Sequence, residues 1–232
     1  AGGKTVLSAQ KAYCISDIST TLTFEGTVRN VRKWSAEHPS LYDCILTLRA
    51  NDDKQQTVVA HKVGFRRIEI KNTRLLVNGV PTYIKGVNRH EFSSVSGRVV
   101  SREELIKDLV TMKQNNINAI RTCHYPDAVG IYELCDEYGI YMIAECNMES
   151  HGSWDISAEQ TGDFSKVVPC DRPEWMDMML DRVNPMYQRD KNHPAILIWS
   201  CGNESFGGKV IYEMSQLYHK MDPNRLVHYE GV

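Results

Sequence analysis

The stretch 195-AILIWSCGNES-205 decides the fold class of this 232-residue chain. An apolar run over residues 195–200 ends abruptly in a small polar cluster that contains Asn203 and Glu204. Continuous apolar runs of roughly four to eight residues are typical of parallel strands that are buried on both faces. The stretch therefore predicts a buried strand that presents a carboxylate at its carboxyl end.

Residues 71–232 repeat this pattern, since short strands alternate with helices and polar clusters follow the strands. Strands are predicted at residues 82–87, 118–122, 140–146, 195–200 and 226–230. Such alternation predicts a parallel sheet, and polar side chains after successive strands favour a (β/α)8 TIM barrel over an open doubly wound sheet. We therefore predict an α/β fold, an incomplete TIM barrel of about five βα units.

Capping residues predict where three of the helices begin or end. Ser101 with Glu104, and Asp171 with Glu174, have the spacing of a capping box at a helix start. Gly139 follows a helical apolar pattern and predicts a helix end, because glycine readily adopts the left-handed backbone found there.

Residues 1–70 have a different texture, with short stretches of alternating apolar and polar residues separated by turn signals. Strands are predicted at residues 20–31, 41–50 and 55–70, the last as one or two strands, with a turn at residues 51–53. Such strands are typical of a β-sandwich, and about four of them are too few to close one. We therefore predict an incomplete sandwich that precedes the α/β domain.

Composition excludes several function classes. The net charge of -2 gives no basic surface for nucleic acid or for an anionic membrane, and no apolar run approaches the ~20 residues of a membrane helix. The seven cysteines include no C-x-x-C pair, which argues against a zinc ribbon or a thioredoxin-type redox site. Their apolar surroundings favour buried thiols in a reducing compartment such as the cytoplasm.

Glu204 and Asn203 are the first candidate site residues. A carboxylate at the mouth of a buried strand is expected to be partly desolvated, which would raise its pKa and suit it to general acid catalysis. Asn203 can donate a hydrogen bond to a sugar hydroxyl or orient a substrate. The alternative is a structural one, in which Asn203 or Ser205 caps the following helix.

Three further strand ends carry polar candidates. Glu149 and His151 are two residues apart, so in extended backbone both side chains point the same way and could bind Mg²⁺; the alternative is a simple ion pair in a loop. Four residues supply hydrogen-bond donors at the ends of the first two strands: Arg89, His90, Arg121 and His124. The equivalent positions of the two histidines favour substrate contact about as much as a structural role.

Several segments closely resemble the β-galactosidases of glycoside hydrolase family 2, and the resemblance covers nearly the whole chain from Trp34. They are 85-KGVNRHE-91, 112-MKQNNINAIRTCHYPD-127, 134-LCDEYGIYMIAECNMESHG-152, 188-QRDKNHPAILIWSCGNES-205 and 222-DPNRLVHYEG-231. The resemblance implies a partial immunoglobulin-like β-sandwich over residues 1–70 and the first part of a TIM-barrel catalytic domain over residues 71–232. It also implies retaining hydrolysis of β-galactosides such as lactose by two carboxylates.

The resemblance also implies residue roles. Glu204 matches the acid/base, Asn203, His90 and His124 match residues that contact the sugar, and Arg121 matches an arginine that supports the nucleophile. Glu149, His151 and Glu204 match Mg²⁺ ligands, and the intact enzymes also use Na⁺ and are often homo-oligomers.

One departure from the family pattern bears directly on activity. The family nucleophile follows the seventh barrel strand, whereas this chain ends after the fifth, at Glu230, which is not that residue. We therefore expect the nucleophile to lie outside this chain and the chain alone to be inactive. The alternatives are a non-catalytic carbohydrate- or metal-binding module derived from such an enzyme, a related family 2 β-glucuronidase, and a purely structural protein.

Overall fold

The computed structural model describes residues 3–14, 18–50, 55–155 and 158–230. Contacts divide the chain into two units, residues 1–32 and residues 33–232. The described part of the first unit has no helix or strand, so the strand predicted at residues 20–31 is wrong. Its apolar residues Leu22 and Phe24 are 36% and 44% exposed. Alternating apolar and polar residues do not form a strand unless another element packs against the apolar side chains.

A hairpin opens the second unit. Strands β1 (Tyr42–Arg49) and β2 (Gln56–Val63) pair antiparallel, with Tyr42 opposite Val63 and Arg49 opposite Gln56. These two strands confirm the predictions for this region, while the predicted turn at residues 51–53 lies outside the described residues.

A small antiparallel sheet follows the hairpin. It has the order β3-β4-β5, with bounds β3 (Ile68–Lys71), β4 (Arg74–Val77) and β5 (Val80–Pro81). The strand predicted at residues 82–87 is only partly present, because β6 begins at Gly86. Asn118 explains the difference, since its side chain accepts a hydrogen bond from the Lys85 backbone and donates one to the Tyr83 carbonyl, in place of a strand partner.

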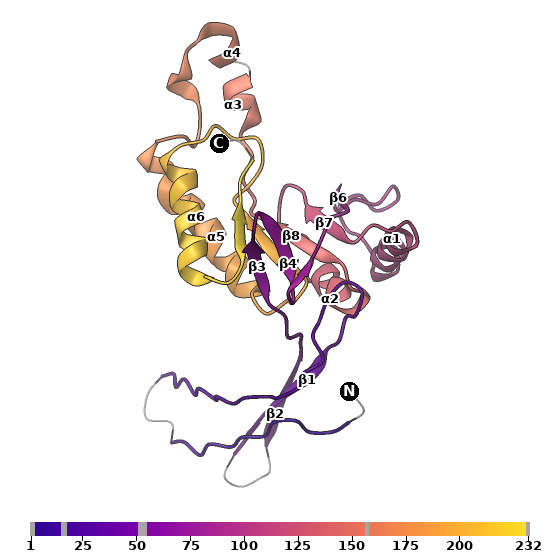
Figure 1. Ribbon diagram of the computed structural model, residues 1–232. Coiled ribbons are helices and arrows are strands. Elements are labelled where there is room, and N and C mark those ends of the chain that lie inside the picture. The colour runs from indigo at the N-terminus through magenta and orange to yellow at the C-terminus, as the bar shows by residue number, and fades with distance from the viewer. Residues whose placement is uncertain (1–2, 15–17, 51–54, 156–157, 231–232) are drawn as a thin grey trace. The chain divides into compact units, whose positions relative to one another are not determined.

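The five-stranded parallel sheet holds the candidate site (Figure 1). Its order is β10-β9-β8-β7-β6, so strands adjacent in sequence are adjacent in space, as in a barrel wall. Every pair is parallel. The strands are β6 (Gly86–Arg89), β7 (Ala119–Thr122), β8 (Tyr141–Glu145), β9 (Ile196–Ser200) and β10 (Leu226–His228). This sheet confirms the α/β prediction of five parallel strands.

Helices connect these strands, and α1 packs against α2 as α5 packs against α6. The four long helices are α1 (Arg102–Gln114), α2 (Val129–Tyr138), α5 (Met176–Asp190) and α6 (Lys209–Met221). The connection from β8 to α5 also carries four short helices, α3 (His151–Asp155), α4 (Ala158–Thr161), η1 (Phe164–Lys166) and η2 (Pro173–Trp175). Among the described residues, no helix is long and apolar enough to cross a lipid bilayer.

Two of the three predicted helix boundaries are confirmed. Ser101 and Glu104 form the reciprocal capping box at the start of α1, and Gly139 ends α2 with a left-handed φ of 72°. The box predicted at Asp171 and Glu174 is wrong. Asp171 instead accepts a hydrogen bond from the backbone of Lys209 at the start of α6, so one carboxylate caps a helix remote in sequence.

The core fixes the amino ends of the barrel strands. Trp34 is fully buried, donates to the Asp136 carbonyl at 2.8 Å and meets the ring of Tyr141 edge to face. Arg66 donates to the carbonyls of Pro194 and Ile196 at 2.6 and 2.7 Å, at the beginning of β9. Strands β8 and β9 are therefore anchored at one end, and their other ends present the polar residues.

Candidate active site

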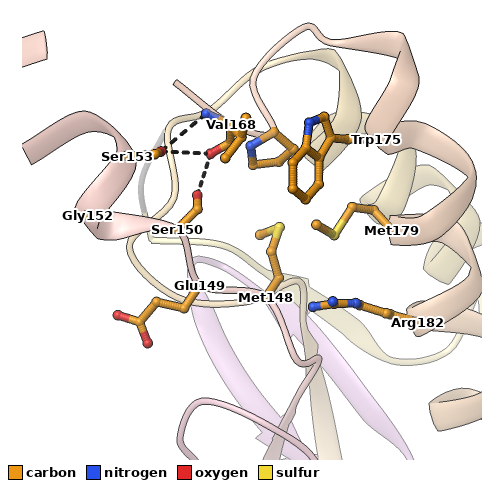
Figure 2. A pocket seen from close by; sticks show the side chains of 10 residues that line it. Met148, Glu149, Ser150, Gly152, Ser153, Val168, Trp175, Met179 and Arg182 are labelled. Carbon is orange, nitrogen blue, oxygen red and sulfur yellow. Dashed lines mark hydrogen bonds between the residues drawn. The ribbon is translucent and has the colours of Figure 1, made fainter. Parts of the chain in front are cut away.

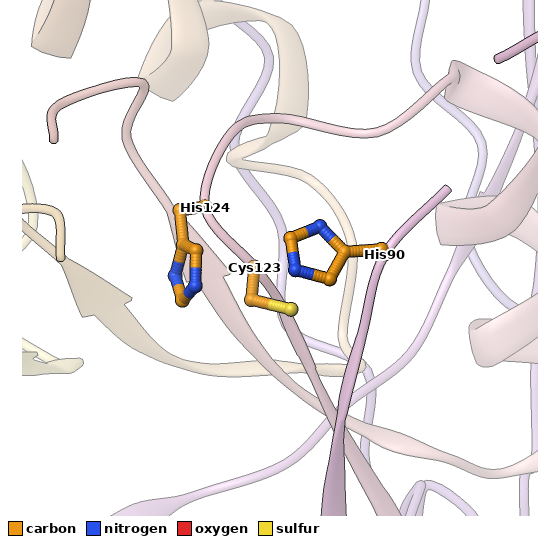
Figure 3. Close-up of side chains that lie close together, drawn as sticks. All are labelled: His90, Cys123 and His124. Atoms are coloured by element: carbon orange, nitrogen blue, oxygen red, sulfur yellow. The ribbon is translucent and has the colours of Figure 1, made fainter. Parts of the chain in front are cut away.

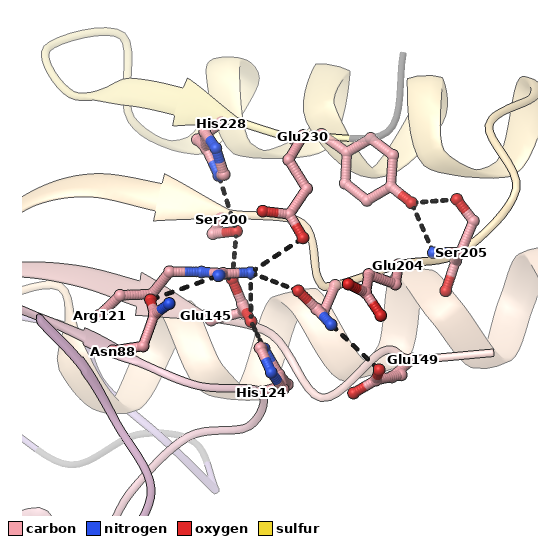
Figure 4. A network of polar contacts seen from close by, with 12 residues as sticks. Asn88, Arg121, His124, Glu145, Glu149, Ser200, Glu204, Ser205, His228 and Glu230 are labelled. Atoms are coloured by element: carbon pink, nitrogen blue, oxygen red, sulfur yellow. Dashed lines mark hydrogen bonds and ion pairs between the residues drawn. The ribbon is translucent and has the colours of Figure 1, made fainter. Parts of the chain in front are cut away.

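Polar side chains gather at the carboxyl ends of the five parallel strands (Figure 4). Arg121 lies on β7, His124 follows it, Glu149 follows β8, and Asn203 and Glu204 follow β9. A network of hydrogen bonds and ion pairs links the first four of these and brings them together as the sequence predicted. The carboxyl ends of parallel strands meet at one edge, which is where this class of fold carries its functional groups.

Glu145, the last residue of β8, is the centre of this network. Its side chain is fully buried, and Arg121 contacts it with Nε at 2.5 Å from Oε2 and Nη2 at 3.0 Å from Oε1. The Nδ1 atom of His124 lies 2.8 Å from Oε1, and the Ser200 hydroxyl donates to Oε2 at 2.8 Å. The buried carboxylate thus has a cationic partner and further hydrogen bonds, which a buried charge requires.

Arg121 also fixes the orientation of Asn203. Its Nη2 donates to Oδ1 of Asn203 at 2.8 Å, and the Nδ2 of Asn203 donates to Oε1 of Glu149 at 3.0 Å. Asn203 is only 3% exposed, so its amide is held by a donor on one side and an acceptor on the other. The same Nη2 lies 3.5 Å from Oε1 of Glu230, which follows β10.

Glu204 contacts a different set of residues. Its Oε2 lies 2.5 Å from Nδ1 of His151, whose ring stacks on Trp154 at a centroid distance of 4.7 Å. The indole Nε1 of Trp154 donates to the Glu204 carbonyl at 3.2 Å. The Glu204 side chain is 48% exposed, so the residue beyond the end of this buried strand is half-buried.

Glu149, His151 and Glu204 form a cluster in which each residue offers one ligand atom within 4.8 Å of the others. Two carboxylates and one imidazole are a suitable donor set for a divalent cation. The residues predicted as metal ligands are therefore brought together, and their chemistry fits Mg²⁺, which favours carboxylate oxygens and retained waters.

The segment that carries Glu149 and His151 is tied to residue 168 (Figure 2). The hydroxyls of Ser150 and Ser153 donate to the Val168 carbonyl, and the Val168 backbone donates to Ser153. A cavity of about 380 Å³ lies beside this segment, and its lining mixes apolar side chains such as Met148 with polar ones such as Arg182. Glu149 also lines this cavity, with its carboxylate pointing away from Met148 and Trp175 (Figure 2), so the cavity adjoins the cation cluster.

His90 and His124, predicted to contact substrate, lie together (Figure 3). Their rings meet edge to face with centroids 5.3 Å apart, and Nδ1 of His90 lies 3.1 Å from the hydroxyl of Tyr125. Because His124 also contacts Glu145, the histidine pair adjoins the Arg121 network.

Sequence reasoning missed Glu145 as a site residue. The signal was available, because Glu145 ends the apolar strand 141-YMIAE-145 just as Glu204 follows 195-AILIWS-200. Ser200 and Asn88 were also missed; Ser200 is the last residue of β9 and Asn88 the second-last of β6, and only the fold brings them to the same network.

Comparisons with known proteins agree with this architecture. Residues 68–232 match the glycosyl hydrolases family 2 TIM barrel domain, and residues 1–66 match glycosyl hydrolases family 2. The β-galactosidase of Streptococcus thermophilus is 50% identical over 204 residues, 87% of this chain and 19% of that protein. The β-galactosidase of Priestia megaterium is 47% identical over 235 residues, covering 100% of this chain and 22% of that protein.

Solved structures are similar as well. A β-D-glucuronidase of Dictyoglomus thermophilum has a TM-score of 0.70 at 25% identity, covering 86% of this chain and 34% of that one. A β-glycosidase of Bacteroides vulgatus has a TM-score of 0.68 at 28% identity, covering 87% of this chain and 25% of that one. The chain spans about a fifth of the length of these two curated relatives. With the family domain matched over residues 68–232, the chain belongs to glycosyl hydrolase family 2.

Proposed function

We propose that a protein containing this chain hydrolyses terminal non-reducing β-D-galactose residues of β-galactosides such as lactose. The observation that carries the proposal is the position of Glu204, half-exposed at the carboxyl end of β9 beside Asn203, whose amide Arg121 and Glu149 orient. The β-galactosidase names of the relatives support the choice of sugar.

In this mechanism Glu204 is the general acid and later the general base. His151 lies against Oε2, so we assign proton transfer to the other oxygen, Oε1, which would protonate the glycosidic oxygen as the bond to the sugar breaks. Asn203 binds a sugar hydroxyl, and His90 and His124 bind further hydroxyls from the neighbouring strand ends. Arg121 acts through Asn203 and Glu145, whose positions it fixes.

The second carboxylate of a retaining mechanism lies about 5–5.5 Å from the acid. We propose that this nucleophile is a glutamate outside the 232 residues of this chain, which Arg121 helps to orient. The chain alone is then inactive, and Glu204-dependent release of a chromophore from a galactoside by the 232-residue chain would contradict this.

We propose that Glu149, His151 and Glu204 hold Mg²⁺ and that a protein containing this chain also uses Na⁺. A bound divalent cation supplies positive charge that stabilises the clustered carboxylates and orients the acid/base. The fit rests on the 4.8 Å grouping of the ligand atoms. Replacing His151 by Ala is expected to weaken Mg²⁺ binding about tenfold in calorimetry.

We further propose that residues 1–70 form part of an immunoglobulin-like sandwich and that the assembled protein is a cytoplasmic homo-oligomer. The free state of all seven cysteines supports a reducing compartment. Size-exclusion chromatography with light scattering tests the oligomeric state.

The substrate class is tested by comparing p-nitrophenyl β-D-galactoside with the matching glucuronide in a protein containing this chain. We expect kcat/KM to be at least about a hundredfold higher for the galactoside. A sugar that does not match the site leaves polar groups of the site without hydrogen-bond partners, which costs binding energy. A preference for the glucuronide would support the β-glucuronidase alternative. Tight galactose binding without turnover would support a carbohydrate-binding module.

A further inference from the structure

A second cluster of potential metal ligands lies outside the Glu149 cluster and carries a different chemistry. His90, Cys123 and His124 each offer one ligand atom, and these atoms lie within 4.8 Å of one another. His90 follows β6, while Cys123 and His124 follow β7, so the fold supplies the three ligands from two adjacent strand ends (Figure 3). Imidazole nitrogen and thiolate sulfur are the donors that Zn²⁺ and similar soft or borderline cations prefer, whereas Mg²⁺ prefers oxygen.

The hydrogen bonds of both histidines leave the same ring nitrogen for a metal. Nδ1 of His124 lies 2.8 Å from the buried Glu145 carboxylate, and Nδ1 of His90 lies 3.1 Å from the Tyr125 hydroxyl. In metal sites the non-ligating nitrogen of a histidine is typically held by a carboxylate or another oxygen, which fixes the tautomer and the ring orientation. In this cluster that arrangement makes Nε2 the ligand atom of each ring.

The burial of the three residues gives the cluster one closed and one open side. Cys123 is 1% exposed, His124 is partly buried and His90 is exposed. Three protein ligands with solvent on one side are the arrangement of zinc sites that keep a fourth position for water or another small ligand.

We propose that His90, Cys123 and His124 form a second metal site that takes Zn²⁺ or a similar divalent cation, and that occupancy of this site blocks sugar binding. Coordination forms two nitrogen–metal bonds and one sulfur–metal bond, and the Cys123 thiol releases its proton to solvent. The metal-binding part of the proposal rests on the positions of the three ligand atoms alone. The inhibition rests on the proposed function, since it requires that His90 and His124 contact the sugar.

Calorimetric titration of the 232-residue chain with Zn²⁺ tests the binding. Millimolar Mg²⁺ is present to occupy the carboxylate cluster of Glu149, His151 and Glu204. We expect one site per chain and at least about tenfold weaker binding in the Cys123→Ser variant. Cys201→Ser is the matched control, because Cys201 is equally buried and lies outside the cluster. Unchanged binding in Cys123→Ser, together with loss in His151→Ala, would assign Zn²⁺ to the carboxylate cluster and overturn the proposal.

Co²⁺ gives a second readout that depends on the sulfur. We expect a thiolate-to-cobalt charge-transfer band in the near ultraviolet that Cys123→Ser abolishes, and its absence from the unmodified chain would overturn the proposal. Should Cys123→Ser not fold, His90→Gln decides, because His90 is exposed and its replacement does not disturb the core.

Activity is measured separately, in a protein that contains this chain, because the chain alone is expected to be inactive. Zn²⁺ that binds without slowing galactoside hydrolysis would overturn the inhibition alone, and absence of any turnover would count against the proposed function while leaving the calorimetry intact.

Discussion

Arg121 and Glu145 form a two-point ion pair between neighbouring strands, with distances of 2.5 Å from Nε to Oε2 and 3.0 Å from Nη2 to Oε1. The side chains are 11% and 0% exposed, so neither charge can be solvated by water if the other is lost. The planar guanidinium matches the two carboxylate oxygens and thereby sets the direction in which Arg121 presents its remaining donors to Asn203.

Replacing Glu145 by Gln is expected to lower the free energy of unfolding by about 3 kcal/mol, because the buried Arg121 charge loses its nearest carboxylate and keeps the partly exposed Glu230 at 3.5 Å. Urea unfolding followed by circular dichroism measures the change. Glu133→Gln is the control, since Glu133 is exposed on α2, and it should alter stability by no more than about 0.5 kcal/mol. Equal effects of the two substitutions would show that the ion pair contributes little.

The barrel strands could be predicted because their signals are local. The runs 141-YMIAE-145 and 195-AILIWS-200 are apolar over a strand's length, and burial on both faces requires little beyond that composition. Glu204 was identified because it follows such a run. Glu145 was passed over because it lies within the apolar run, although its position at the strand end is equivalent.

Other features could not be predicted, because they depend on contacts between residues remote in sequence. Asp171 has the spacing of a local capping box with Glu174, yet its carboxylate binds the backbone of Lys209. Leu22 and Phe24 have the alternation of a strand, yet a strand also needs a neighbour to accept its hydrogen bonds. The half-exposed state of Glu204 likewise depends on where the chain turns after β9.

Gly202 is expected to be irreplaceable at the entry to the Asn203–Glu204 pair. Its φ is 146°, and a Cβ there would lie 2.6 Å from the carbonyl oxygen of Met148, which accepts the Asn203 backbone hydrogen bond. Gly202→Ala should therefore lower the free energy of unfolding by about 1–3 kcal/mol and displace Asn203.

The control is Gly152→Ala, because a Cβ at Gly152 meets nothing within 4 Å. Unfolding in urea compares the two variants, and loss of backbone position at Asn203 should appear as protection lost from its amide in hydrogen exchange. A Gly202→Ala variant as stable as Gly152→Ala would refute the steric argument.

Asp127 should make the stability of the protein fall as the pH rises. Burial raises the pKa of Asp127 to about 7, the nearby charge of Glu91 adds to this, and Arg89, 3.0 Å away, acts in the opposite direction. The unfolded chain loses this proton near pH ~4. Between these values the folded state binds more protons than the unfolded state, so the free energy of unfolding decreases with rising pH.

The variant Asp127→Asn removes that dependence. From about pH 5 to about pH 8 the unfolding free energy of the unmodified protein should fall by about 2.5 kcal/mol relative to the variant. Asp108→Asn controls for the loss of an ion pair with Arg89, because Asp108 is the half-exposed partner of the same arginine. A difference between the protein and Asp127→Asn that stays constant with pH would contradict the prediction.

If Glu204 is the acid, its replacement should lower kcat/KM most for substrates whose leaving group must be protonated as it departs. In a protein containing this chain, Glu204→Gln is expected to lower kcat/KM for lactose by about 10²–10⁴, because the departing sugar alkoxide must be protonated. For a dinitrophenyl galactoside the loss should be less than about tenfold, since the phenolate leaves without a proton.

Glu149→Gln is the matched control: Glu149 belongs to the same cation cluster, so its replacement disturbs the metal ligands without removing the acid. Equal losses on both substrates for Glu204→Gln would mean that Glu204 binds the cation and does not transfer the proton.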